Sequence, residues 1–94
     1  MFTYLNPALH STIRLAVISL LVREESQEFN QIVQKTHASA GNLSTQLQKL
    51  QKLNYIEITK QFRDNYPLTI CKITSKGKDA YFEYAEALKS YILW

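Results

Sequence analysis

The sequence predicts an α+β fold that is mainly helical, with three helices, a two-stranded hairpin and a last helix. Apolar residues recur at spacings of three and four before residue 54 and again after residue 74, which is typical of helices. Between them, residues 55–74 alternate between apolar and polar types around a cluster of turn residues. The chain has 94 residues and is 46% hydrophobic, so we expect one small domain spanning 1–94.

Asn6 and Pro7 predict the start of the first helix, because asparagine caps helices and proline suits their first turn. We expect this helix to run from Ala8 to about Val22. Its apolar residues cover most of its circumference, which indicates burial on more than one side. Residues 23–27 are predicted to form a polar break.

A short helix is predicted over about 30–36, with Asn30 as its cap, and a longer helix over about 41–53. The small residues of 38–41 form the tight turn between them, so the pair has the pattern of a helix-turn-helix. Asn54 suits a left-handed helix end. The apolar residues of the longer helix are spaced by four, three and three, which places them on one face: Leu43, Leu47, Leu50 and Leu53.

A hairpin is predicted from strands over 55–62 and 68–74, joined by a five-residue turn. We expect Tyr66 to pack under the hairpin, with exposure on its outer surface as the alternative. Thr74 then caps a last helix from Ser75 to about Leu93, which is apolar over most of its surface except for one narrow polar stripe.

Charge is unevenly distributed along the chain. Residues 35–78 hold eight basic and two acidic residues, whereas the rest hold three basic and six acidic residues. A basic centre between acidic flanks indicates a surface that faces a polyanion. An uneven but merely solvated surface is the alternative.

Four segments carry a resemblance to a known family: 5–15, 41–50, 54–56 and 73–78. In their order and spacing, the chain resembles the single-domain winged helix-turn-helix regulators of the MarR and ArsR groups. The resemblance implies a homodimer that binds double-stranded DNA. The chain departs from the family pattern at Asn54, where glycine is usual, and in a hairpin whose only arginine is Arg63, next to Asp64.

In such a domain the third helix lies in the major groove and the hairpin is the wing. We expect base contacts from Asn42, Ser44, Thr45 and Gln48, because amides and hydroxyls can pair with base edges. Phosphate contacts are expected from Lys49 and Lys52, and contacts with phosphates or the minor groove from Lys60 and Arg63 on the hairpin. These residues could instead be only a polar helix face. For Arg14 we expect an ion pair with a glutamate; bracing the third helix or contacting a phosphate are the alternatives.

The apolar surface of the last helix, about 75–93, exceeds what so small a domain can bury, and this predicts dimerisation. The expected interface residues are Tyr81, Tyr84, Leu88, Tyr91 and Ile92; core packing is the alternative. Tyr4, Phe82 and Tyr84 could also line a pocket for an effector, whose existence the sequence leaves unknown.

No metal site, cofactor or enzyme activity is predicted. His10 and His37 have no further ligands at metal-binding spacing, and the single cysteine, Cys71, has the position of a buried strand residue. The longest apolar stretch, 15–22, is far short of the ~20 residues of a membrane span. We therefore expect a cytoplasmic protein without a membrane partner. A winged helix that binds another protein instead of DNA remains an alternative.

Overall fold

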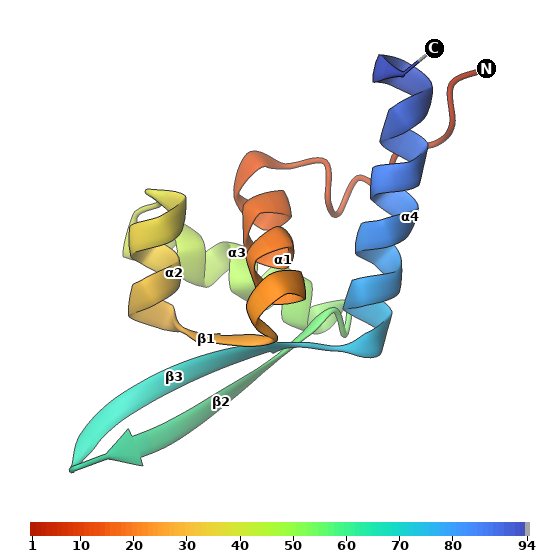
Figure 1. The fold of residues 1–94 in the computed structure, drawn as a ribbon. Helices are drawn as coiled ribbons and strands as arrows, with labels where there is room; N and C mark the ends of the chain where they lie inside the picture. Colours follow the sequence, from red (N-terminus) through yellow and green to blue (C-terminus); the bar gives the residue numbers. More distant parts are fainter. Residues whose placement is uncertain (94) are drawn as a thin grey trace.

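The computed structural model describes residues 1–93, which form four helices and a three-stranded sheet (Figure 1). The predicted order of helices and hairpin strands in a mainly helical α+β fold is confirmed. One short strand is additional. The elements are α1 (Thr12–Glu24), β1 (Ser26–Glu28), α2 (Phe29–Thr36), α3 (Ala40–Lys52), β2 (Ile56–Arg63), β3 (Tyr66–Ile73) and α4 (Ser75–Ile92).

Helix α1 begins at Thr12, later than predicted, and its cap is Ser11. Asn6 instead caps a separate turn, in which its side-chain Oδ1 accepts a hydrogen bond from the N–H of Ala8 at 3.0 Å. The backbone carbonyls of Pro7 and Ala8 accept hydrogen bonds from the Arg14 guanidinium. Because a side chain satisfies these carbonyls, the segment does not join the helix that follows.

Strand β1 lies in the segment that was predicted to be a polar break. It pairs antiparallel with β3, with Gln27 opposite Cys71, and the sheet order is β1-β3-β2. Its residues Ser26, Gln27 and Glu28 have no apolar alternation, so no local pattern marks it. Backbone pairing with a strand more than forty residues away in the sequence forms it.

The hairpin is longer and its turn tighter than predicted. Strands β2 and β3 pair from Ile56 opposite Ile73 to Arg63 opposite Tyr66. The turn is only Asp64 and Asn65, both with positive φ (51° and 69°), which asparagine and aspartate tolerate in two-residue hairpins. The predicted five-residue turn is therefore wrong. Tyr66 belongs to β3 and is 73% exposed, so it does not pack under the hairpin.

Local capping signals are confirmed in part. The backbone of Asn54 is left-handed (φ 61°), and the Thr74 hydroxyl accepts a hydrogen bond from the N–H of Gly77 at 3.0 Å at the start of α4. The predicted Asn30 cap is wrong. Helix α2 is capped by Glu28, whose N–H donates to the side chain of Gln31 at 3.3 Å in a capping box.

The core lies where α1, α3 and the sheet meet. Helix α3 contributes Leu43, Leu47 and Leu50, all at most 2% exposed, which confirms the predicted apolar face. Leu53 is an exception: it caps α3 and is 39% exposed. Burying three leucines on one side requires the polar residues of α3 to lie on the other.

Cys71 is a free cysteine with no exposed surface, at the centre of the sheet, as the sequence predicts. Burial raises the pKa of its thiol from 9.0 to about 11, and the nearby positive charge of Lys60 offsets only part of that rise. The thiolate is the reactive form of cysteine, so both burial and pKa make this sulfur unreactive.

Gly77 permits a close contact between α4 and the start of the hairpin. A Cβ atom at this position would lie 2.2 Å from the carbonyl oxygen of Tyr55. That oxygen also accepts a hydrogen bond from the N–H of Thr74 at 3.1 Å, so it is not free to move. Only glycine allows this approach.

We predict that Gly77→Ala lowers the free energy of unfolding by about 2 kcal/mol, because the methyl group forces two backbone segments apart. Gly41→Ala is the matched control. Gly41 lies in α3 with nothing within 4 Å of an added Cβ, so alanine there is expected to stabilise by about 0.5–1 kcal/mol. Urea unfolding followed by circular dichroism measures both changes. Equal stability of Gly77→Ala and the parent would contradict the contact.

We predict that the Cys71 thiol of the folded protein resists a thiol reagent at pH 8. With a pKa of about 11, roughly one thiol in a thousand is ionised at that pH, and none of its surface is exposed. Reaction with a chromogenic disulfide reagent is expected to be at least about a hundredfold slower than in guanidinium, where Cys71 is exposed. Equal rates would show that the site is open.

Candidate nucleic-acid interface

The outward face of α3 carries six of the residues predicted to contact DNA. All six are exposed, because the three core leucines occupy the opposite face. Within residues 1–93, no intramolecular hydrogen bond or ion pair engages four of their side chains, namely those of Ser44, Gln48, Lys49 and Lys52. The other two are Asn42 and Thr45.

Thr45 and Asn42 are already partly hydrogen-bonded in the free protein. The Thr45 hydroxyl donates to the carbonyl of Gly41 at 3.2 Å, which leaves its oxygen as an outward acceptor. The side-chain Oδ1 of Asn42 accepts from the Nε2 of Gln46 at 3.1 Å. Each of these two side chains therefore has fewer free hydrogen-bonding groups for a ligand than an unengaged threonine or asparagine would have.

A groove of about 400 Å³ separates α3 from the hairpin. Ser44 and Gln48 line it from α3, and Lys60 and Thr69 line it from the hairpin. The fold thus places three of the predicted contact residues around one opening. The hairpin projects away from the helices beyond this groove (Figure 1).

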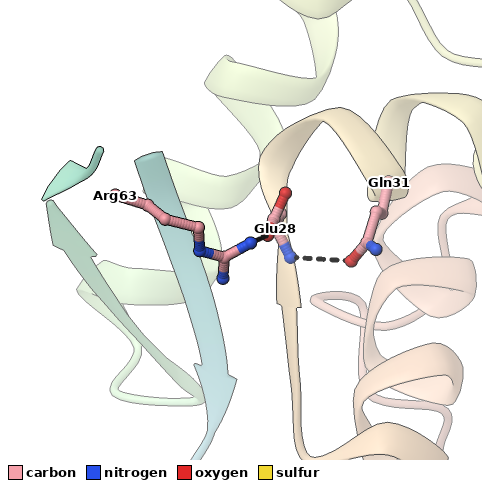
Figure 2. A network of polar contacts seen from close by, with 3 residues as sticks. All are labelled: Glu28, Gln31 and Arg63. Atoms are coloured by element: carbon pink, nitrogen blue, oxygen red, sulfur yellow. Dashed lines mark hydrogen bonds and ion pairs between the residues drawn. The ribbon is translucent and has the colours of Figure 1, made fainter. Parts of the chain in front are cut away.

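Arg63 does not line that groove. Its guanidinium forms an ion pair with the carboxylate of Glu28 at 3.3 Å, and Figure 2 shows the arginine reaching from the end of β2 toward the start of α2. The Glu28 backbone N–H also donates to Gln31. The Arg63 side chain is 68% exposed, so solvent weakens the pair, which orients the arginine more than it stabilises the fold.

The predicted ion pair of Arg14 with a glutamate is wrong, and Arg14 instead takes the alternative role of bracing the third helix. The guanidinium donates to the carbonyl of Ala8 at 2.7 Å and to the side-chain Oε1 of Gln46 at 2.5 Å. Gln46 was not among the predicted site residues. Its only sequence signal is its position four residues after Asn42, which places the two side chains on neighbouring turns of α3.

The inner side of α4 packs on α1. Tyr84 is 4% exposed, and its hydroxyl is 2.9 Å from Nδ1 of His10. Tyr81 is half-buried and its hydroxyl accepts from Ser19 at 3.1 Å, while Leu88 is half-buried against the core. A side chain as buried as Tyr84 offers almost no surface to a partner.

The outer end of α4 lies beside the N-terminal segment. The Tyr91 hydroxyl donates to the carbonyl of Thr3 at 3.0 Å, and the Tyr91 ring contacts that of Phe2. Both chain ends lie at the same end of the molecule (Figure 1). Most large apolar side chains that are more than half exposed lie in the N-terminal segment and on α4: Met1, Phe2, Tyr4, Phe82, Ile92 and Leu93. Phe62 and Tyr66 of the hairpin are the others within residues 1–93.

Across residues 1–93, no group of three or more histidine, cysteine or acidic residues is arranged to hold a metal ion. His10 is engaged with Tyr84. In the same part of the chain, no helix combines the length and apolar character needed to cross a membrane.

Comparisons with known proteins agree with this geometry. The winged helix DNA-binding domain family matches residues 13–92. The chain is 35% identical to the uncharacterized protein MJ0432 of Methanocaldococcus jannaschii over 75 residues, which are 80% of this chain and 82% of the relative.

Solved structures show the same fold. The structure of a transcriptional regulator homologue from Pyrococcus horikoshii OT3 is 25% identical, with a TM-score of 0.85 over 90% of this chain and 84% of its own. A MarR family transcriptional regulator from Silicibacter pomeroyi is 15% identical, with a TM-score of 0.69 over 85% of this chain and 53% of its own.

The family match spans the helix-turn-helix, the hairpin and α4 together, so it covers every element that builds the candidate interface. The predicted resemblance to winged helix regulators is confirmed, and the fold is shared with a MarR family regulator. Membership of a DNA-binding family supports the prediction that the chain is not an enzyme. The chain belongs to the winged helix DNA-binding domain family.

Proposed function

We propose that this chain binds double-stranded DNA with sequence selectivity as a homodimer, with α3 in the major groove and the β2–β3 hairpin as the wing. The observation that carries the proposal is the exposed face of α3. It presents unengaged amide, hydroxyl and ammonium groups beside a groove whose other wall holds Lys60. The proposal treats residues 1–94 as one DNA-binding unit.

The chemistry of α3 suits the major groove. Within residues 1–93, the side chains of Ser44 and Gln48 form no intramolecular hydrogen bond. Their polar groups can therefore pair with base edges without first breaking one. Lys49 and Lys52 lie on the same outward face and supply point charges for phosphate oxygens. Thr45 adds an acceptor oxygen to this set.

The two basic residues predicted to act from the wing are assigned different roles. Lys60 faces α3 across the groove and is the main wing contact of the proposal. Arg63 is held by Glu28, so it must exchange a carboxylate for a phosphate before it can contact DNA. This exchange reduces what Arg63 contributes, and it leaves Lys60 as the more available of the two cations.

The dimer of the proposal forms through the outer part of α4 and the N-terminal segment. Phe2, Tyr4 and Ile92 expose apolar side chains there, and Phe82 exposes another nearer the middle of α4. Several large apolar side chains exposed on one part of a small domain often mark an interface. Tyr84 is left out because it is buried. A two-fold pair of α3 helices would then read half-sites about 34 Å apart.

The proposal includes no effector. Tyr4 and Tyr84 line a depression of about 170 Å³, well below the roughly 300–1,000 Å³ of typical ligand sites. A cytoplasmic location fits a protein that binds the genome, and it stays a prediction. The protein-interaction alternative makes no use of the unengaged polar face of α3, and the first experiment below separates it from DNA binding.

We predict that the double variant Lys49→Glu, Lys52→Glu binds mixed duplex DNA at least a hundredfold more weakly than the parent. Two phosphate attractions become repulsions. The parent should also lose affinity steeply between 50 and 200 mM salt, on the order of a thousandfold for six or more phosphate contacts across the dimer. Fluorescence anisotropy with labelled duplexes measures both effects.

The control compares single charge reversals. Lys89→Glu, on α4, is expected to bind nearly as well as the parent, whereas Lys49→Glu alone is expected to lose about tenfold. If the parent binds no duplex at low salt, the proposal fails and a protein partner becomes the better hypothesis.

We predict that Phe82→Glu with Ile92→Glu raises the dimer dissociation constant at least tenfold. Both side chains are more than half exposed, so the folded monomer should tolerate the changes. Light scattering at micromolar concentration should give twice 10.9 kDa for the parent and a smaller mass for the variant. Phe62→Glu, on the hairpin and 78% exposed, should remain dimeric. A parent mass of 10.9 kDa would exclude the dimer.

A further inference from the structure

Three side chains form a hydrogen-bonded relay that ends on the DNA-facing side of α3. Arg14 donates to Oε1 of Gln46 at 2.5 Å, and Nε2 of Gln46 donates to Oδ1 of Asn42 at 3.1 Å. Gln46 lies at the edge of the exposed face and is half-buried, while Asn42 is exposed in the first turn of α3. Residues near the start of a recognition helix are those that contact base edges.

The direction of every hydrogen bond in this relay follows from its first member. An arginine side chain has only donors, so Gln46 must turn its oxygen toward Arg14. The Gln46 amide nitrogen then faces Asn42 as a donor, so the side-chain oxygen of Asn42 must accept the hydrogen bond. An amide side chain free in solution can flip, but one linked to a fixed donor in this way cannot do so without losing a hydrogen bond.

Arg14 is itself held in place. Its Nε donates to the carbonyl of Ala8 at 2.7 Å, and its second terminal nitrogen lies 3.4 Å from the carbonyl of Pro7. These carbonyls belong to the turn that precedes α1 and have no helical N–H partner. The relay therefore runs from a fixed turn outside α3 to the outward face of α3.

We infer that Asn42 reads DNA as a donor only and selects guanine over adenine at the base it contacts. The inference rests on the proposed DNA-binding role of α3. Asparagine recognises adenine with one donor and one acceptor. The hydrogen bond from Gln46 takes one lone pair of the Asn42 oxygen and turns that oxygen toward Gln46, whereas no hydrogen bond within residues 1–93 engages the Asn42 amide nitrogen. The free amide group has two donors, which match the N7 and O6 acceptors of guanine. Arg14 and Gln46 are positioning residues that set this choice without touching the base.

Gln46→Glu tests the inference with almost no change in size. Glutamate has only acceptors, so it keeps the contact with Arg14 but can no longer donate to Asn42. Asn42 then turns its amide nitrogen toward the new carboxylate and presents its oxygen to the groove. The base preference at that position should move from guanine to a base with an amino group at the major-groove edge, adenine or cytosine.

The experiment is selection from a pool of random duplexes with the parent, Asn42→Ala and Gln46→Glu. In the parent motif, one position should favour guanine over adenine by about tenfold. Asn42→Ala should lose the preference at that position alone, and Gln46→Glu should shift it as described. Gln51→Glu places the same charge on α3 outside the relay, and it should weaken binding to all duplexes without changing the preferred base.

A parallel measurement uses the protein without DNA. In ¹⁵N-labelled protein, the Asn42 side-chain amide protons should exchange with solvent rapidly in the parent and more slowly in Gln46→Glu, where one of them becomes hydrogen-bonded. Unchanged exchange would overturn the relay whether or not DNA binds. Thermal unfolding of each variant confirms that it is folded.

The selection experiment separates the two proposals. A motif in which the Asn42-dependent position is adenine, or one that Gln46→Glu leaves unaltered, overturns the donor-only inference and leaves DNA binding intact. If no duplex binds the parent at low salt, the proposed function fails, and the inference about base choice fails with it.

Discussion

The contact between Tyr55 and the first turn of α4 is the one on which the rest of the structure depends. The Tyr55 carbonyl accepts from the N–H of Thr74 and lies so close to Gly77 that no side chain fits there. Its hydroxyl accepts from the Nδ2 of Asn6 at 2.9 Å, and the Lys76 ammonium lies 5.8 Å from the centre of its ring. One residue thus joins the N-terminal turn, the hairpin and α4, and it determines the direction in which α4 leaves the core.

This junction separates two surfaces of different character. On one side lie α3 and the hairpin (Figure 1), where exposed amides, hydroxyls and lysines accompany the exposed rings of Phe62 and Tyr66. On the other lie the N-terminal segment and α4, whose exposed large side chains are mostly apolar. A polar surface suits DNA and an apolar one suits a second copy of the chain. Because the same junction holds both surfaces, the way two copies meet would set the spacing of their α3 helices.

From the sequence, the candidate site was predictable only for residues within one helix, α3. The spacing of Leu43, Leu47 and Leu50 indicates which side of α3 faces the core, and so which residues lie outside. The partners of those outer residues were not predictable in the same way. Arg14 is 32 residues from Gln46, and Glu28 is separated from Arg63 by two helices and most of a strand, so no spacing rule connects them. These contacts set the orientation of Asn42 and Arg63.

By itself, the sequence determined the features that a few neighbouring residues can stabilise: the left-handed Asn54, the Thr74 cap, the leucine face of α3 and the order of helices and hairpin strands. Only the tertiary structure decided where α1 begins, that residues 26–28 form a strand, and which way the amides of α3 point. The physical reason is the same in each case. Asn6 before α1 donates to the Tyr55 hydroxyl, β1 pairs with β3, and the Gln46 amide accepts from Arg14, so each group takes a partner from a distant segment that is present only once the chain has folded.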